Sequence, residues 1–271
     1  MLLEAEQNLQ QGNLTEALVS LQEQIRKNPA NPKFRVFLFQ LLTVLGQWER
    51  ALTQLNVVGD LDATALPMVQ TYREAVACEL LRNQIFQGGK TPLVFGEPTQ
   101  WLALLQQALK LDTELQHKDA QILREQAFEL APVTQGTLNG EAFEWLADAD
   151  MRLGPVLEAI INGRYYWIPF QQIQQIKIEE PVDLRDVVWM PAHFVWQNGG
   201  DTVGLIPTRY PGSETAVDSA IRLARKTEWT ALGETTFIGS GQRLLSTNNN
   251  DYALMDIREI NINAVCSSWL N

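Results

Sequence analysis

The chain has 271 residues, of which 45% are hydrophobic, and a formal net charge of −11 at pH 7. This length suffices for one large domain or two smaller ones whose cores need no disulfide or metal. Nucleic-acid binding is not expected from so acidic a chain, because affinity for nucleic acids comes largely from Lys and Arg that displace counterions from phosphates.

Cysteine usage and the first residues bear on the cell compartment. Cys78 and Cys266 lie far apart, so we interpret them as two reduced thiols and not as a disulfide framework or a zinc site. The opening MLLEAEQ carries acids where a secretory leader carries basic residues, and no apolar run approaches the roughly 18 residues of a membrane span. We therefore expect a soluble, cytoplasmic protein without a membrane partner.

The first 89 residues show successive amphipathic helix patterns that contain a repeat. Gly12 and Gly46 are 34 residues apart. The same offset maps Leu14, Ala17, Leu18 and Leu21 onto Trp48, Ala51, Leu52 and Leu55. This period is typical of tetratricopeptide repeats, in which small residues let two helices cross closely. Helical hairpins that share the spacing by chance are the alternative.

Proline and glycine predict where these helices end. The segment Asn28–Pro32 separates the first helix pair from the second, because proline cannot continue a helix. A helix is predicted to start at Pro67 and to end at Gly88-Gly89, with Tyr72, Val76, Leu80 and Leu81 on its apolar face. After the linker KTPLVFGEPT, helices are predicted from Trp101 through Ile122 to Leu130, with Thr99 as N-cap and Pro132 as the stop. We predict a domain boundary in the turn-rich segment 132–140, so that a helical-repeat domain spans residues 1–131.

The later sequence is typical of short strands. Asn162-Gly163, between Val156–Ile161 and Arg164–Phe170, predicts a hairpin, since Asn and Gly tolerate the positive φ angles of a two-residue turn. A short helix at Leu157–Ile161 is the alternative. A helical turn is expected at Gln171–Gln175, and then a strand at Val187–Trp196 whose Pro191 indicates an edge or a bulge.

Further strands are predicted to the end of the chain. Asn198–Asp201 predicts a second hairpin loop before a strand at Thr202–Ile206. One helix is predicted within Pro211–Arg225, with Ala216, Ala220, Ile221 and Ala224 on its inner face. Strands are expected at 228–233, 235–238, 243–246 and 252–262, with Gly239–Gly241 as a separator. We predict an α+β fold, in which tetratricopeptide-like repeats precede an antiparallel β-rich domain of residues 139–271, a sheet or a partly open barrel.

The acidic residues could serve a metal-dependent hydrolase. Asp148, Asp150 and Asp186 are candidate oxygen ligands for a divalent metal. However, the spacing of a calcium loop is absent, so ion pairs such as Arg152 with Glu158 and Arg185 with Asp186 are the favoured interpretation.

Other catalytic patterns are missing from the sequence. His117 and His193 are its only histidines, and no nucleotide-binding glycine loop or nucleophile elbow is present. We therefore predict no enzyme activity, no catalytic residues, no metal and no cofactor.

Four blocks of sequence resemble the ImpE family, also called TagJ. They are DADMRLGPVLE (148–158), NGRYYWIPF (162–170), LRDVVWMPA (184–192) and IPTRYPGSE (206–214). The resemblance implies a cytoplasmic, non-enzymatic adaptor of a bacterial type VI secretion system. It also implies two partners: an N-terminal helix of the small, TssB-like subunit of the contractile sheath, and the ClpV ATPase that recycles the contracted sheath.

Residues of these blocks are our candidates for partner binding. They are Arg152, Tyr166, Trp167, Arg185, Asp186, Arg209 and Tyr210. The loop Pro207–Gly212 is expected to present Arg209 and Tyr210 at a rigid contact surface, the alternative being a structural turn whose arginine pairs with a carboxylate such as Glu214. A helical-repeat scaffold for an unrelated partner is the remaining alternative function.

Overall fold

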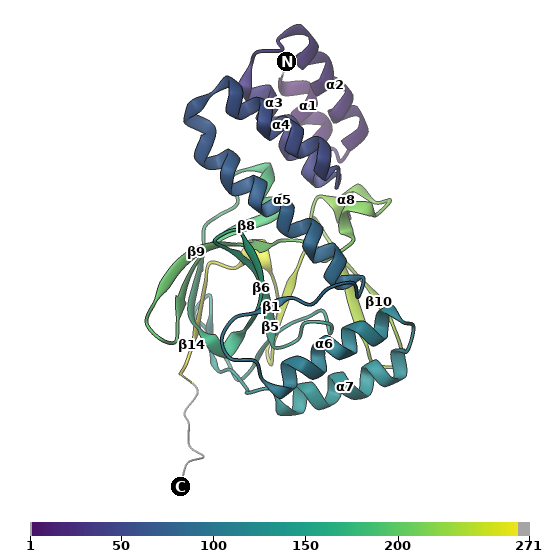
Figure 1. Ribbon diagram of the computed structural model, residues 1–271, viewed down its shortest axis with the longest axis vertical. Coiled ribbons are helices and arrows are strands. Elements are labelled where there is room, and N and C mark those ends of the chain that lie inside the picture. Colours follow the sequence, from purple (N-terminus) through teal and green to yellow (C-terminus); the bar gives the residue numbers. More distant parts are fainter. Residues whose placement is uncertain (1, 265–271) are drawn as a thin grey trace.

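The computed structural model describes residues 2–264, so Cys266 lies outside the described residues. Helical repeats form one end of the molecule, and a strongly curved sheet with a second group of helices forms the other (Figure 1). This arrangement confirms the predicted α+β fold, with helical repeats before a largely antiparallel sheet. No helix among the described residues has the length and apolar character that a membrane span requires.

The repeats consist of four helices. They are α1 (Leu2–Gln10), α2 (Leu14–Lys27), α3 (Pro32–Val44) and α4 (Trp48–Leu61). The 34-residue period is confirmed, because α2 and α4 begin at the equivalent Leu14 and Trp48. Gly12 and Gly46 adopt φ angles of 83° and 67° in the turns before them, a conformation that favours glycine.

A long helix, α5 (Leu66–Phe86), follows the short 3-10 helix η1 (Ala63–Ala65) and runs from the repeats to the sheet (Figure 1). Tyr72 and Val76 are buried as predicted, but Leu80 is 40% exposed. The prediction for Leu80 was wrong because the buried face continues through Glu79 and Arg82 instead. These two charged side chains contact the sheet.

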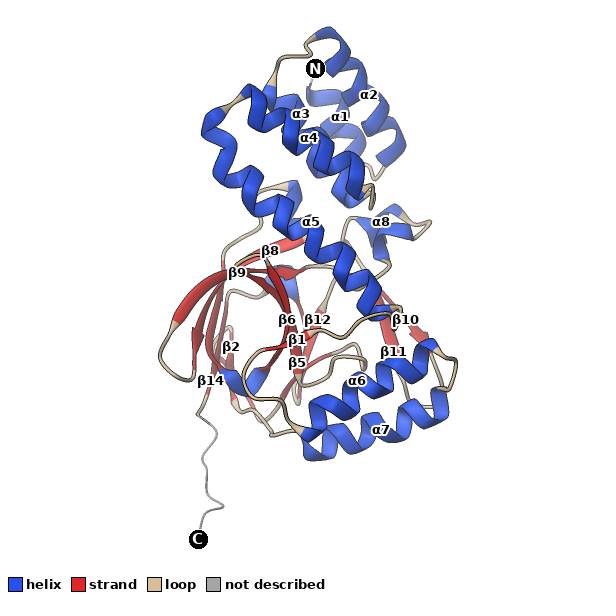
Figure 2. Cartoon of the chain, in the orientation of Figure 1, coloured by secondary structure: helices blue, strands red, loops and turns tan. Residues whose placement is uncertain are grey.

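The remaining long helices form a hairpin of α6 (Gln100–Thr113) and α7 (His117–Leu130). The hairpin lies beside the sheet, at the opposite end of α5 from the repeats (Figure 2). Thr99 occupies the predicted N-cap position but makes no capping hydrogen bond with its side chain. The boundary between residues 131 and 139 stays a prediction, because one hydrophobic core joins the repeats to the sheet.

Nine strands form the main sheet, in the order β1-β6-β5-β9-β8-β7-β14-β2-β3. They are β1 (Leu93–Val94), β2 (Gly136–Leu138), β3 (Glu141–Phe143), β5 (Val156–Ile161), β6 (Arg164–Pro169), β7 (Ile173–Ile178), β8 (Trp189–Trp196), β9 (Asp201–Pro207) and β14 (Glu259–Ile262). Only the pair of β1 and β6 is parallel among the pairings described for this sheet.

Two smaller sheets adjoin it. The first contains β4 (Leu146–Asp148), β12 (Leu244–Thr247) and β13 (Asp251–Ala253), and the second contains β10 (Thr227–Ala231) and β11 (Phe237–Gly241). Short helices connect the strands: η2 (Phe170–Gln172), η3 (Leu184–Val187), η4 (Ser213–Thr215), α8 (Ser219–Arg222) and η5 (Leu254–Asp256).

The predicted hairpin at Asn162-Gly163 is confirmed. Ile161 pairs with Arg164, and the two turn residues have φ angles of 49° and 71°. Val156–Ile161 is therefore a strand, and the alternative of a short helix there was wrong. The predicted loop Asn198–Asp201 likewise joins β8 to β9, except that Asp201 is already the first residue of β9.

Several local predictions were wrong where a distant partner determines the structure. The linker 90–99 contributes β1. The segment 132–140, whose role as a domain boundary stays a prediction, contains β2. Gly239–Gly241 lies within β11, and residues 211–225 hold only η4 and the four-residue α8. The expected turn at Gln171–Gln175 is limited to η2, after which β7 begins.

Pro191 lies in an interior strand, contrary to the expected edge. Strand β8 is flanked by β7 and β9. The register with β7 ends where Ile178 pairs with Ala192, so Pro191 lies beyond the last residue pair on that side. Its missing N–H therefore removes no bond of that ladder.

Candidate functional site

All four blocks of sequence meet in a buried ionic cluster between α5 and the sheet. At its centre the carboxylate of Glu158, on β5, is completely buried. It accepts hydrogen bonds from Arg82 Nε at 2.6 Å and Arg82 Nη2 at 2.8 Å. It also accepts from the guanidinium of Arg243 and from the hydroxyl of Tyr165. One carboxylate on the sheet thus binds an arginine from α5 and an arginine next to β12.

The cluster extends in two directions from Glu158. On one side, the guanidinium of Arg243 pairs with Asp148, which also accepts a hydrogen bond of 3.1 Å from the hydroxyl of Tyr210. On the other side, Glu79 accepts from Trp189 Nε1 at 3.1 Å and pairs with Arg82 at 3.3 Å. The cluster connects α5 to β4, β5 and β8.

Burial and the neighbouring arginines shift the pKa values of the two central carboxyl groups, Glu158 and Asp148, in opposite directions. Burial raises the pKa of Glu158, but Arg82 and Arg243 outweigh it and lower that pKa to about 2. Burial raises the pKa of Asp148 to about 7 although Arg243 opposes the shift. A buried charge is tolerated when it is paired and hydrogen-bonded, which explains why removing one partner from such a cluster is costly.

The structure does not arrange Asp148, Asp150 and Asp186 as the metal site of the hydrolase hypothesis. Asp148 pairs with Arg243 and Asp150 pairs with Arg152, whereas Asp186 accepts from the backbone N–H groups of Val182 and Asp183 at η3. Over residues 2–264 no group of three His, Cys, Asp or Glu side chains is arranged to hold a metal ion.

Two predicted ion pairs have different partners in the structure. Arg152 binds Asp150, and not Glu158, through Nε at 2.9 Å. Arg185 binds Asp183, and not Asp186, through Nη2 at 2.8 Å. In both cases the backbone N–H of the arginine donates to the same carboxylate, two residues earlier. Such a turn holds the arginine beside the carboxylate two residues earlier, so this local ion pair forms in preference to a pair with another carboxylate.

Arg209 and Tyr210 are buried, contrary to the expected exposed loop. Arg209 is 4% exposed and Tyr210 is completely buried. Arg209 does not pair directly with Glu214; it donates to the backbone carbonyls of Thr43, Val44 and Arg222. The alternative of a structural turn therefore describes this loop better, although its arginine binds carbonyls and not a carboxylate.

Five of the seven candidate binding residues have buried side chains, namely Arg152, Trp167, Asp186, Arg209 and Tyr210. Tyr166 and Arg185 keep partial exposure. The rings of Tyr166 and Phe95 form a T-shaped pair with 6.0 Å between centroids, and the Arg185 guanidinium lies over the Tyr72 ring. A direct role of these seven side chains in partner binding stays a prediction.

Three charged members of the cluster, Glu79, Arg82 and Arg243, were missed from the sequence. A signal was present for Glu79 and Arg82, because both continue the apolar stripe of α5 that contains Tyr72 and Val76. A charged residue at such a helical position is buried with a partner or ends the stripe.

A hollow of about 500 Å³ lies on the repeats, and we call it the repeat groove. Its wall on α3 includes Val36 and Phe37, and the segment Val182–Leu184 forms the facing wall. The complete lining is Glu6, Pro32, Lys33, Val36, Phe37, Gln40, Val58, Asp62, Ala65, Val182, Asp183 and Leu184. Gln40 Nε2 donates to Asp183 at 2.9 Å, which ties the facing wall to α3.

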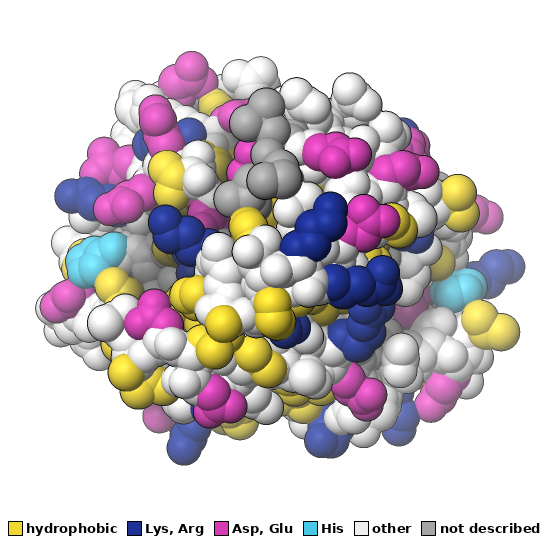
Figure 3. All heavy atoms as spheres, turned by 90° about the horizontal axis from the view of Figure 1, so that it is seen from above, with side chains coloured by type: hydrophobic (Ala, Val, Ile, Leu, Met, Phe, Trp, Pro, Cys, Tyr) yellow, Lys and Arg dark blue, Asp and Glu magenta, His cyan; other side chains and the backbone are white. Residues whose placement is uncertain are grey.

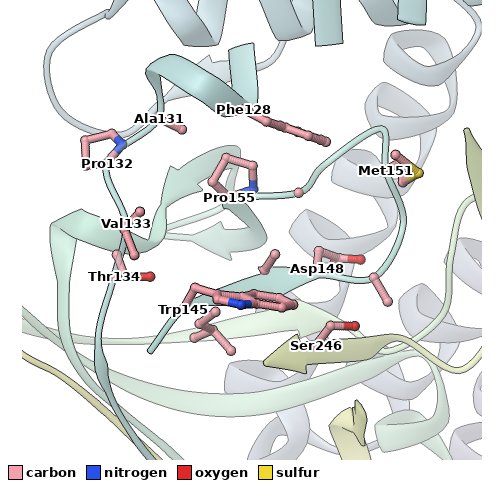
Figure 4. Close-up of a pocket in the computed structure, with 14 residues that line it drawn as sticks. Phe128, Ala131, Pro132, Val133, Thr134, Trp145, Asp148, Met151, Pro155 and Ser246 are labelled. Atoms are coloured by element: carbon pink, nitrogen blue, oxygen red, sulfur yellow. The ribbon is translucent and has the colours of Figure 1, made fainter. Parts of the chain in front are cut away.

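A second hollow, of about 390 Å³, lies between the end of α7 and β4. Figure 4 shows Phe128 and Pro155 on one side of it and Trp145 on the other. We call it the α7 hollow. Its lining is mostly apolar, and Trp145 and Val133 are 41% and 65% exposed.

The surface at the repeat end of the molecule carries no large patch of side chains of one charge sign (Figure 3). Seen from this end, hydrophobic and basic side chains form neighbouring groups with acidic side chains around them (Figure 3). Such a mixed surface is unlike a phosphate-binding face, on which basic side chains would dominate.

Comparisons with known proteins cover both parts of the chain. The family model described as ImpE protein matches residues 140–261, and a tetratricopeptide repeat model matches residues 8–73. The type VI secretion system accessory component TagJ of Pseudomonas aeruginosa is 53% identical over 256 residues, which cover 94% of this chain and 90% of that protein. A crystal structure of a Vibrio parahaemolyticus protein is similar with a TM-score of 0.88 at 26% identity, over 96% of this chain and 97% of that one.

Proposed function

Because the chain belongs to the ImpE family and has an accessory role in a type VI secretion system, we propose that it is a non-enzymatic adaptor for the contractile sheath. In this proposal it binds a helical segment near the N-terminus of the small sheath subunit. It thereby assists sheath assembly or the disassembly that the ClpV ATPase drives. In this proposal the protein acts in the cytoplasm.

The observation that carries the proposal is the 53% identity to TagJ over 94% of the chain. Identity at this level extends over the repeats and the sheet together, so the relative and this chain share one architecture. The repeats also supply a surface of the right type, because stacked helix pairs form concave faces on which peptides dock. The charged clusters described above are closed internal pairs, which favours binding over catalysis.

A titration tests the proposal. The full chain is added to a fluorescently labelled peptide that contains the N-terminal helix of the small sheath subunit from the same bacterium. We expect saturable binding with a dissociation constant in the micromolar range or below, and no binding to a scrambled peptide of the same composition. Absence of binding by the folded chain would contradict the proposal.

A further inference from the structure

We propose that the repeat groove is the docking surface for the partner and that it takes an amphipathic helix with an apolar anchor and a basic flank. The inference rests on the proposed adaptor function, because it names the surface and the chemistry of the same partner. It does not depend on the partner's identity, however, since the lining of the groove defines the chemistry.

The apolar part of the groove has two facing walls. Val36 and Phe37 on α3 form one wall with partly buried side chains. Leu184 and Val182 form the other. An apolar side chain inserted between these walls would lose its contact with water on both sides, which is the main source of affinity in helix-in-groove recognition.

Val182 is the residue that most requires an explanation. Its side chain is 92% exposed, although the adjoining backbone is held firmly. The N–H of Val182 donates to Asp186 at 2.8 Å, and the following Asp183 is bound to Gln40 and Arg185. An apolar side chain is thus presented to solvent from an ordered segment at the groove, as expected for one side of a contact.

Charge at the groove favours a basic partner. Glu6 and Asp62 line it, and no salt bridge is made by either among the described residues. The hydroxyl and amide of Thr64 lower the pKa of Asp62, so this carboxylate is ionised at neutral pH. Glu179 and Glu180, which precede Val182 in the chain, are exposed but lie outside the groove lining.

Two basic residues at the groove only partly offset this acidity. Lys33 is the one basic residue in the groove lining, and Arg185 nearby is already paired with Asp183. Lysine or arginine beside the apolar anchor of a partner would therefore be attracted to the Glu6 and Asp62 side, and this attraction would fix its register.

Matched substitutions on the full chain test the inference with the same labelled sheath peptide. Val182→Ser should weaken binding about tenfold, because the anchor loses one wall. Glu6→Lys should weaken it about threefold and reduce its salt dependence. Val217→Ser is the control, since Val217 is 99% exposed but lies outside the groove lining. All three sites are exposed, so the thermal unfolding of the variants should match that of the original chain.

Two results would overturn the inference. One is unchanged affinity for both Val182→Ser and Glu6→Lys. The other is that Trp145→Ser loses binding while Val182→Ser and Glu6→Lys bind the peptide as tightly as the original chain. That result would place the partner in the α7 hollow.

A second probe separates this inference from the proposed function. A designed helix with a leucine stripe flanked by lysines should bind and lose affinity with Val182→Ser, whereas the same helix with glutamates should not bind. If the designed helix behaves in this way but the sheath peptide fails to bind, the adaptor proposal is wrong and the groove inference holds. If neither helix binds the folded chain, both are wrong.

Discussion

Arg209 and Arg225 make the same contact on two successive repeats. Arg209 donates to the carbonyls of Thr43 and Val44, at 3.2 Å and 2.9 Å. Arg225 donates to the carbonyls of Leu9 and Gln10, at 2.9 Å and 2.8 Å. The two carbonyl pairs are 34 residues apart, which is the period of the repeat.

These carbonyls lie at the C-terminal ends of α3 and α1. There the last carbonyls of a helix have no partner within the helix, and the helix dipole carries its negative end. Each repeat is therefore capped by an arginine from the segment that follows β9. The two caps hold the ends of α1 and α3 to the β-rich part of the chain, and both helices also contribute to the repeat groove.

Replacing the two capping arginines should have unequal effects. Arg209→Ala removes a buried guanidinium that donates to the carbonyls of Val44, Arg222 and Thr43, of which only Thr43 keeps a backbone donor, Gly46 N–H. This loss should lower the free energy of unfolding by about 3 kcal/mol. Arg225→Ala exposes its two carbonyls to water, so the loss should stay below about 1 kcal/mol. Urea denaturation followed by tryptophan fluorescence measures both, and equal losses would show that burial does not determine the strength of these caps.

The two equivalent glycines provide a second matched pair. Alanine at Gly12 or Gly46 must adopt a positive φ, which costs roughly 1 kcal/mol. A Cβ at Gly46 would also lie 2.5 Å from Cγ of Glu214, whereas the nearest atom to one at Gly12 is 3.8 Å away. Gly46→Ala should therefore lower the melting temperature more than Gly12→Ala, unless the Glu214 side chain moves aside. A double variant with Glu214→Ala checks that cause, because it should remove the difference.

The Asp148 carboxyl should make stability depend on pH. Its pKa in the folded chain is about 7, raised from 3.8. The folded state then binds more protons than the unfolded state between these values, so stability should fall as pH rises from about 4 to about 7. The pKa of Glu158 is lowered to about 2, so its contribution is lost only on acidification below about 4.5.

Urea midpoints measured between about pH 5 and about pH 7 follow this decline, to which Glu79 also contributes because burial raises its pKa. Asp148→Asn should flatten the decline across this window, because asparagine has no proton to lose. The same slope in this variant and in the original chain would assign the dependence to another group.

The thiol of Cys78 should be unreactive in the folded protein. It is buried and donates to the carbonyl of Gly163 at 3.4 Å, and burial raises its pKa to about 12. Because only the thiolate reacts with a disulfide reagent, labelling at neutral pH should be negligible until denaturant is added. A Cys266→Ser variant makes the signal specific to Cys78, and rapid labelling of the native variant would contradict the prediction.

Local chemistry made much of the fold predictable. A positive φ at Gly12, Gly46 and Asn162-Gly163 depends on the residue and its neighbours, so the turns of the repeats and the hairpin β5–β6 could be located from the sequence. The helix start at Pro32, with Asn31 as its cap, is equally local. Strands β1 and β2 could not be predicted, because each has only two or three residues and is defined by a distant partner.

The sequence by itself determined the 34-residue period, the change from helices to strands and the four blocks that mark the family, since each depends on residues close together in the chain. Only the tertiary structure decided what the charged residues do. Glu158 meets Arg82 across 76 residues, and Arg209 meets Val44 across 165. The energy of a buried charge depends on which groups surround it in space, and that depends on how α5 and the repeats pack on the sheet.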